Sequence, residues 1–514
     1  MKQQFALSPN LRQVRAGDWT AVYHSRLGGL CLLDNEADQM LNSFEHGKLV
    51  DLDDLKPEAI APDLELTRQC IARQFLVPFE DGRISPPAVI ESAPKVNVVQ
   101  LVLVNACNFG CTYCFEGVQG TELERQPVKP NSSLVNLTSL TGETAKPREV
   151  KVNLEDSVYA SEIRLAHQRD ADNRLMAPDD AIRYVERAIK IARDTGVKQL
   201  MIQFFGGEPM MNWKAIAAVL QEFGNGSRHG IELTYTIVTN GSLITAERAA
   251  TFRQYGVGVC VSFDSPLSNS RPLKNGKDSR PVVIEGLRKL QAHGVRIAIN
   301  ATLSSATWDV FDPALVDFAV TMGCHEIGVV VDLDPTFYEH FGGERITDKL
   351  WSVVEAGRRQ GVIVTGYWHQ IFQIMNGFGV VARRGFKNCS AKGAQLSIEP
   401  NGSVFSCKAG SGYFGSILED SLLQSESYRA HANLREENPA FCHGCDIEGF
   451  CAGICLGPLE KKFGTIDSVE IAACDFYRRI TKKFVSSVMP HDVATFDLGS
   501  ARRRNAQTPV GASA

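Results

Sequence analysis

Several common features are missing from this chain of 514 residues. No apolar run approaches the length of a membrane span, and the N-terminal segment MKQQFALSPNLRQVRAGDW lacks the apolar core of a signal peptide. Positive charge is not in excess, because the formal net charge is −5, so nothing in the composition suggests nucleic-acid binding. We therefore expect a cytoplasmic protein with neither membrane nor nucleic-acid partners.

The remaining composition is that of an ordinary globular protein, with 44% hydrophobic and 22% charged residues. Residues 1–95 suggest a small α+β domain. Its stretch WTAVYHSRLGGLCLLD predicts a hairpin that turns at Gly28 and Gly29, and NEADQMLNSFEHG and PDLELTRQCIARQFLV predict two amphipathic helices. The proline-rich stretch from Ser85 to Lys95 is typical of a linker.

A regular alternation of strands and helices follows over residues 96–340. The strands are rich in Val and Ile, as strands buried on both faces of a parallel sheet are. Between them lie helical patterns such as APDDAIRYVERAIKIARDTG. Six such units predict an α/β fold, an open (β/α)6 barrel similar to part of a TIM barrel, with chemistry at the carboxyl ends of the strands. The six predicted strands are residues 96–104, 198–205, 231–238, 258–264, 295–303 and 327–333.

Four further segments complete the organisation. Residues 118–175 form a long polar insertion after the first strand, which is either a lid or substrate clamp or a disordered loop. Residues 341–374 predict a helical connection. Residues 375–490 form a cysteine-rich domain, and the polar tail at 491–514 is expected to be disordered.

Ten of the 14 cysteines fall into two patterned groups, which in a reducing compartment favours metal binding over disulfides. The first group is Cys107, Cys111 and Cys114, spaced C-x3-C-x2-C after the first strand. Iron–sulfur and structural zinc sites usually take four protein ligands, so this group is one short. Either the open iron of a four-iron cluster takes a small molecule, or a distant residue supplies the fourth ligand. The second strand ends in Gly-Gly-Glu-Pro at 206–209, where glycines allow close backbone approach and a carboxylate can hold an ammonium.

These two motifs resemble those of the radical S-adenosylmethionine (SAM) superfamily. The resemblance implies that Cys107, Cys111 and Cys114 hold a [4Fe-4S] cluster whose open iron binds SAM. Electron transfer from the cluster then yields a 5′-deoxyadenosyl radical that removes a hydrogen atom from substrate. The resemblance also implies SAM-binding roles for six other positions, with Arg271 and Arg280 as alternatives for the carboxylate and with Ser265 replacing a glycine of the family's S-x-D-G-P. These positions are Tyr113, Gly206, Gly207, Glu208, Ser262 and one of Arg271 and Arg280.

The second group contains seven cysteines at close spacing, more than one zinc site would use. Its pattern resembles the SPASM extension of radical SAM enzymes, which holds two auxiliary [4Fe-4S] clusters. That resemblance assigns Cys389, Cys407 and Cys455 to an inner cluster with an open iron. It assigns Cys442, Cys445, Cys451 and Cys474 to an outer one, giving three clusters in all. The four remaining cysteines are expected to pack as small hydrophobes, namely Cys31, Cys70, Cys260 and Cys324.

SPASM proteins act mostly on peptides, so the main hypothesis is a maturase of a ribosomally made precursor peptide. It would form a thioether, carbon–carbon or carbon–oxygen crosslink, an epimerised residue or a cyclopropane. The N-terminal domain resembles winged-helix domains that bind a leader peptide as an added strand, and a flavodoxin or ferredoxin would supply electrons. Alternatives are a formylglycine-forming sulfatase maturase, an enzyme acting on a small molecule and a redox protein without turnover. Glu116 and Lys408 are candidate catalytic residues, although Lys408 stands where sulfatase maturases carry an aspartate base.

Overall fold

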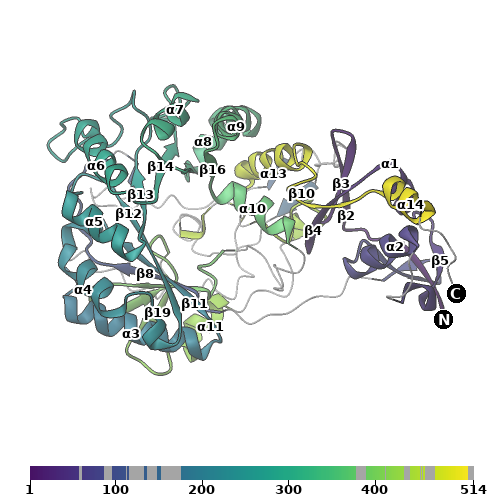
Figure 1. The fold of residues 1–514 in the computed structure, drawn as a ribbon, viewed down its shortest axis with the longest axis horizontal. Helices are drawn as coiled ribbons and strands as arrows, with labels where there is room; N and C mark the ends of the chain where they lie inside the picture. The colour runs from purple at the N-terminus through teal and green to yellow at the C-terminus, as the bar shows by residue number, and fades with distance from the viewer. Residues whose placement is uncertain are drawn as a thin grey trace.

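The structure is a computed structural model with two lobes, one built on a large barrel-like sheet and the other on the N-terminal strands and helices (Figure 1). Helices α10 (Tyr367–Asn376) and α13 (Ile471–Ser486) lie between the lobes. The residues it describes are 1–56, 61–85, 95–111, 113–114, 132–135, 148–151, 175–377, 389–410, 412–432, 440–451, 453, 455–457 and 469–507.

The N-terminal lobe contains two four-stranded sheets, in the orders β5-β1-β6-β7 and β2-β3-β4-β20. Its strands are β1 (Lys2–Leu7), β2 (Leu11–Ala16), β3 (Trp19–His24), β4 (Gly28–Leu33), β5 (Lys48–Asp51), β6 (Leu76–Glu80) and β7 (Arg83–Ile84). Its two helices are α1 (Asn35–Asn42) and α2 (Pro62–Ala72), as the sequence predicts. The α1 helix is capped by Asp34, whose carboxylate accepts a hydrogen bond from the amide of Ala37.

The predicted hairpin is present, but the turn lies a few residues before the predicted position at Gly28 and Gly29. Strands β3 and β4 pair antiparallel, with His24 opposite Gly28, so residues 25–27 make the turn and the two glycines open β4. Gly28 has a φ of 78°, and a Cβ there would lie 2.4 Å from the carbonyl oxygen of Gly377. The amide of Gly29 donates to that same oxygen at 3.2 Å. These glycines therefore permit close contact with the end of α10 rather than a chain reversal.

The barrel sheet confirms all six predicted strands and their parallel pairing. Its ten strands are ordered β16-β15-β14-β13-β12-β11-β8-β17-β18-β19. The predicted six are β8 (Val98–Val102), β11 (Gln199–Phe205), β12 (Glu232–Thr239), β13 (Gly258–Ser262), β14 (Ile297–Leu303) and β15 (Glu326–Val331). A seventh parallel strand, β16 (Ile363–Thr365), lies within the segment predicted as a helical connection.

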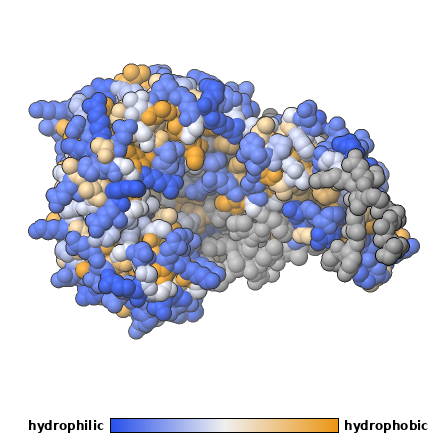
Figure 2. Space-filling view, viewed as in Figure 1, coloured by the Kyte–Doolittle hydropathy of each residue, from blue (hydrophilic) through white to orange (hydrophobic). Residues whose placement is uncertain are grey.

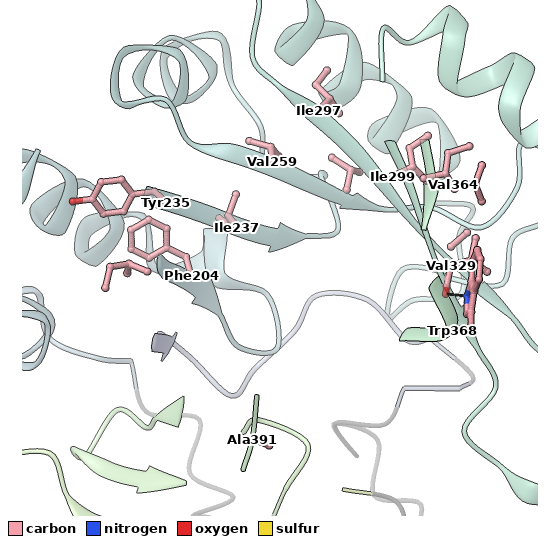
Figure 3. Packing of buried hydrophobic residues seen from close by; sticks show 14 of the residues in the cluster. Phe204, Tyr235, Ile237, Val259, Ile297, Ile299, Val329, Val364, Trp368 and Ala391 are labelled. Atoms are coloured by element: carbon pink, nitrogen blue, oxygen red, sulfur yellow. Dashed lines mark hydrogen bonds between the residues drawn. The ribbon is translucent and has the colours of Figure 1, made fainter. Parts of the chain in front are cut away.

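Helices cover the outer face of this sheet (Figure 1). They are α3 (Pro178–Asp194), α4 (Trp213–Phe223), α5 (Ala246–Tyr255), α6 (Arg280–Ala292), α7 (Ala314–Thr321), α8 (Pro335–Phe341) and α9 (Gly343–Gln360). Every second strand residue is buried in this layer, among them Ile237, Val259 and Ile299 (Figure 3). The intervening residues, such as Thr236 and Asn300, are half-exposed on the inner face. The strands are thus fully buried on one face only, whereas their Val and Ile content predicted burial on both faces.

The cysteine-rich region is built partly into the same sheet. Strand β17 (Gln395–Ile398) pairs parallel with β8, and β18 (Ser403–Phe405) and β19 (Tyr413–Ser416) continue antiparallel beyond it. A short helix, α11 (Glu426–Ala432), packs beside β19. Helix α13 follows and packs against α9, α10 and β2, which ties this region to both lobes.

The prediction of a disordered C-terminal tail is wrong for most of its length. Strand β20 (Ala494–Phe496) pairs parallel with β4, and α14 (Leu498–Gln507) packs on α1 and α2 (Figure 1). The side chain of Leu498 is fully buried in the N-terminal core, which orders a segment that reads as polar.

Within the insertion at 118–175, the structure describes two short paired strands, β9 (Ser132–Val135) and β10 (Arg148–Lys151). It also describes Leu175, which forms a β-bridge with Val104. The prediction of a lid concerns mainly residues that lie outside the described ranges.

The face of the molecule shown in Figure 2 is mostly hydrophilic, with hydrophobic residues in small groups. No described helix has the length and apolar composition required to cross a bilayer.

Candidate functional site

The first cysteine group lies on a loop at the carboxyl end of β8, and the loop is held to its neighbours by main-chain contacts. Phe109, in the middle of the loop, is 3% exposed and forms a β-bridge with Leu273. The amide of Gly110 donates to the carbonyl of Pro272 at 2.8 Å. A buried aromatic anchor between two thiols fixes the loop while leaving Cys107 and Cys111 half-buried at its surface.

The three thiols are close enough to influence one another. Burial raises the pKa of Cys111 to about 11, and the charges of Cys114 and Cys107 add to the rise although Arg271 opposes it. Among described residues, no three His, Cys, Asp or Glu side chains converge on one metal ion. A four-iron cluster bonds each thiolate to a different iron, so its ligands surround a cube rather than meet at one point. Three thiols on one anchored loop fit that requirement, and cluster binding would deprotonate them.

The glycines of the Gly-Gly-Glu-Pro motif pack directly on the cysteine loop. An added Cβ at Gly206 would lie 2.3 Å from the carbonyl oxygen of Val104, and one at Gly207 would lie 2.4 Å from that of Ala106. The amides of Gly207 and Glu208 donate to these two oxygens at 2.8 and 2.9 Å. Because these glycines have no side chains, the segments that follow β11 and β8 can pack directly against each other. The sequence suggested only that the glycines allow a ligand to approach the backbone.

Glu208 is 1% exposed and stands beside the first cysteine group. Its carboxylate accepts hydrogen bonds from the hydroxyl of Thr239 at 2.6 Å and from the amides of Asn240 and Met210 at 2.7 and 3.0 Å. Burial outweighs these bonds and raises its pKa to about 7. A carboxyl group with this pKa changes its protonation state near neutral pH, and the nearby charge of Arg248 favours the ionised form.

At the end of β13, a single carboxylate organises the neighbouring side chains. Asp264 accepts two hydrogen bonds from the guanidinium of Arg271, at 3.0 and 3.1 Å, and others from the Tyr113 hydroxyl, the Ser270 hydroxyl and the amide of Thr302. The guanidinium carbon of Arg271 lies 5.3 Å from the centre of the Tyr113 ring. Burial disfavours the charged carboxylate, but the charge of Arg271 and these hydrogen bonds lower the pKa of Asp264 below its ordinary value.

This arrangement separates the two candidate arginines. Arg271 is half-buried against Asp264 and Tyr113, and its charge lowers the pKa of Cys111. Arg280 instead pairs with Asp278 at 2.7 Å on the surface, at the start of α6. Ser262 ends β13 on the half-exposed inner face. The structure thus brings Tyr113, Glu208 and Arg271 close to the cysteine loop and leaves Arg280 outside.

Sequence reasoning missed the residues that connect these groups. Asp264 lies in the stretch SFDSP, where the resemblance gives a role to Ser262 alone, and Asn240 lies in the stretch TNG, directly after β12. The Asn240 amide donates to the Asn108 side chain at 2.8 Å and approaches the Cys107 sulfur at 3.9 Å. The sequence does contain one signal for them, because both residues lie at the carboxyl ends of predicted parallel strands, and polar residues at such ends meet at one edge of the sheet.

Lys408, a candidate base, is engaged in a buried polar group. Its ammonium donates to the side-chain oxygen of Asn105 at 2.6 Å and lies 3.7 Å from the carboxylate of Glu399. Asn105 in turn donates to Glu399 at 3.2 Å. Because Asn105 begins the cysteine loop and Lys408 follows Cys407, this group links the two cysteine regions. Glu116, the other candidate, lies outside the described residues.

Electrostatic interactions connect cysteines of the second group with one another and with Tyr367. Burial raises the pKa of Cys474, and the charges of Cys451, Cys442 and Cys445 raise it further, which places these four thiols together. The pKa of Tyr367, the first residue of α10, is well above its ordinary value, first because of the charge of Cys455 and then because of burial and the charges of Cys389 and Cys407. The three proposed inner ligands therefore lie within electrostatic reach of the start of α10.

The N-terminal lobe contacts the outer set through a buried ion pair. Arg12 donates to the carboxylate of Asp446, next to Cys445, at 2.5 Å, and to the carbonyl of Gly444 at 3.0 Å. Of the four other cysteines, Cys31, Cys70 and Cys324 are buried as expected. Cys260 departs from that expectation, because it is only half-buried on the inner face of β13.

Comparison with known proteins agrees with the two cysteine regions. The family model of the radical SAM superfamily matches residues 101–305, and that of an iron-sulfur cluster-binding domain, SPASM, matches residues 389–446. The chain is 35% identical to the radical SAM cyclopropyl synthase TigE of Paramaledivibacter caminithermalis over 482 residues, which is 90% of this chain and 92% of that protein.

The fold is shared with solved structures. It resembles that of anSMEcpe with bound AdoMet, with a TM-score of 0.52 and 15% identity, over 80% of this chain and 99% of that one. The structure of anSMEcpe with AdoMet and the Cp18Cys peptide gives a TM-score of 0.51 at 15% identity, covering 79% and 99% of the two chains.

Proposed function

This chain belongs to the radical SAM superfamily and carries an iron–sulfur cluster-binding domain, and we propose that it closes a cyclopropane ring in a ribosomally made peptide. The observation that carries this proposal is the 35% identity to a cyclopropyl synthase over nearly the whole of both chains. Among the products that the sequence leaves open, a cyclopropane is the one this relative's name supports.

The first cysteine group and its neighbours form the proposed SAM site. When bound there, the cluster and SAM supply a 5′-deoxyadenosyl radical that removes one hydrogen atom from the substrate. Glu208 would hold the SAM amine, Arg271 would hold its carboxylate, and Tyr113 would contact adenine. Asp264 fixes Arg271 and Tyr113 in their relative positions, because both donate to its carboxylate.

Ring closure removes two hydrogen atoms from the peptide. The first leaves in 5′-deoxyadenosine, and the second must leave as a proton and an electron. We propose that the cysteine-rich domain, with Cys389, Cys407 and Cys455 as an inner set and the other four as an outer set, holds two auxiliary clusters that take up this electron. Seven thiols arranged in these two sets support the assignment. A flavodoxin or ferredoxin supplies the electron for SAM cleavage.

The test is an anaerobic incubation of the reconstituted enzyme with reductant, SAM and synthetic peptides encoded by reading frames that flank the gene. We expect 5′-deoxyadenosine and a peptide lighter by two hydrogen atoms whose spectrum shows cyclopropane protons. Absence of 5′-deoxyadenosine with every peptide would refute the enzyme assignment for these substrates. A product that reacts with a hydrazide would instead be an aldehyde and favour the formylglycine alternative, which the ion pair of Lys408 disfavours.

A further inference from the structure

The edge of the sheet in the N-terminal lobe is covered by a strand from the far end of the chain. Ala494, Thr495 and Phe496 of β20 pair in register with Cys31, Leu32 and Leu33 of β4. A small cavity lies between this pair of strands and α2, lined on the helix side by apolar Leu66 and Cys70 and by polar Gln69 and Arg73. The site therefore holds an extended segment between a strand edge and a mixed apolar and polar helix face, which is how sheet edges bind peptides.

This covering segment, which we call the C-terminal strap (Ala494–Gln507), is held by few strong contacts. Its strand is three residues long, and Ala494 and Thr495 are exposed. Arg502 of α14 pairs with Glu36 at 3.1 Å and with Asp63 at 2.9 Å, but its side chain is 50% exposed. Ion pairs at such exposure add little to stability. The apolar contacts of Leu498, which is fully buried, and of Phe496 hold the strap against the N-terminal core.

The strap also shares its contacts with the first helix of the lobe. The amide of Asp34 donates to the carbonyl of Phe496 at 3.2 Å, and the Asp34 carboxylate accepts from the amide of Gly499 at 3.2 Å while it caps α1. On its other side, the strap follows α13, the helix that carries Cys474. Displacement of the strap would therefore change the contacts of the sheet edge at β4 and the chain connection to α13 of the cysteine-rich domain.

We propose that the C-terminal strap is a built-in occupant of the strand site on β4, and that a segment of the substrate peptide displaces it. This inference rests on the proposed function, because it requires a peptide substrate. Without the strap, β4 would present unpaired backbone groups beside a partly apolar helix face, a surface that attracts extended chains of many sequences. The strap closes that surface in the resting enzyme and lowers the apparent affinity for peptide by the fraction of molecules in which it is docked.

Two variants of the full chain test this. Arg502→Glu replaces both ion pairs with repulsion from Glu36 and Asp63, and Phe496→Asp places a charge in the apolar contact. Arg503→Glu makes the same charge change as the first at a neighbouring arginine for which the described residues show no ion pair to the lobe. The probes are a fluorescent synthetic copy of residues 490–507 and the synthetic peptides from the flanking reading frames, with binding measured by anisotropy and β4 amides followed by hydrogen exchange.

We expect Phe496→Asp to bind the probes about tenfold more tightly than the unaltered chain, and Arg502→Glu to show a smaller gain in the same direction, because its ion pairs are exposed. We also expect β4 amides to exchange faster until a probe is added, and Arg503→Glu to behave like the unaltered chain. Unchanged affinity and unchanged exchange in both strap variants would overturn the inference while leaving peptide modification intact. If strap variants bind only the copy of residues 490–507, and no chain modifies any flanking peptide, the proposed function fails and the strap is a structural clasp.

Discussion

Asp264 receives two hydrogen bonds from Arg271 through both of its carboxylate oxygens, and the same carboxylate accepts the hydroxyl of Tyr113. Each partner comes from a different loop at the barrel mouth, so one buried charge sets their separation. In the proposed SAM site, Asp264 is thus a positioning residue that acts through Arg271 and Tyr113.

Replacing Asp264 with Asn should therefore weaken SAM binding and slow SAM cleavage by about a hundredfold, because small displacements of binding groups are costly. The free energy of unfolding should fall by about 3 kcal/mol, since Arg271 loses its buried partner. The matched control is Asp278→Asn, which removes the surface partner of Arg280 and should change neither quantity. Measurements of SAM affinity and of 5′-deoxyadenosine formation check this, and equal effects of the two substitutions would contradict it.

The pKa of Glu208, raised to about 7 by burial, predicts a pH-dependent affinity for SAM. An ammonium favours the ionised carboxylate, so affinity should fall as pH drops from 7 to 6, approaching tenfold for each unit further below the pKa. Above pH 8 it should level off. Isothermal titration across this range is the measurement, and Glu208→Gln should bind weakly without this slope. A parallel slope in the Gln variant would assign the titration to another group.

The same shift makes a prediction about stability. The folded pKa lies above the ordinary value of 4.5, so the carboxyl stabilises the fold below pH 4.5 and this contribution is lost as pH rises towards 7. Denaturant unfolding at a series of pH values should show a loss of about 3 kcal/mol from this one group. Glu208→Gln should remove that component of the pH dependence, and an unaltered profile would show that Glu208 ionises normally.

Gly207→Ala should disturb the cysteine loop, because the new methyl group would lie 2.4 Å from the Ala106 carbonyl oxygen. We expect a cost of about 1–3 kcal/mol in stability and a reduced iron content after reconstitution. Gly258→Ala is the control, since a Cβ at that strand residue meets its nearest neighbour at an ordinary 3.6 Å. Full iron loading in the Gly207 variant would mean that the loop adapts without consequence for the cluster.

Cys474→Ser tests the grouping of the auxiliary cysteines. If the chain holds three four-iron clusters, iron content should drop from about twelve to about eight per chain while the SAM cluster remains. Cys324→Ser, at a buried cysteine of the barrel core, should retain all of the iron. Iron and sulfide analysis of anaerobically reconstituted protein gives the numbers. A total of about four irons in the unaltered chain would refute the three-cluster assignment.

The local patterns of the sequence predicted the barrel well, because each strand carries its own signal of Val and Ile bounded by polar residues. Contacts between distant segments were not predictable in this way. Strand β17 pairs with β8 almost 300 positions earlier, and β20 has only three residues, too few to signal a strand. Asp264 stands in the stretch that resembles S-x-D-G-P, but its importance comes from partners that the fold brings together.

The pairing of β17 with β8 has a practical consequence for anyone who wishes to divide the molecule. The sequence match to the cluster-binding domain begins at residue 389 and suggests a transferable module. Yet β17, Gln395 to Ile398, is buried along its entire length as an internal strand of a ten-stranded sheet. Excision would expose a sheet edge on both pieces, and such edges promote aggregation. A chimera that takes this domain from a relative should therefore take β8 with it, because otherwise β17 and β8 come from different proteins and their pairing is lost.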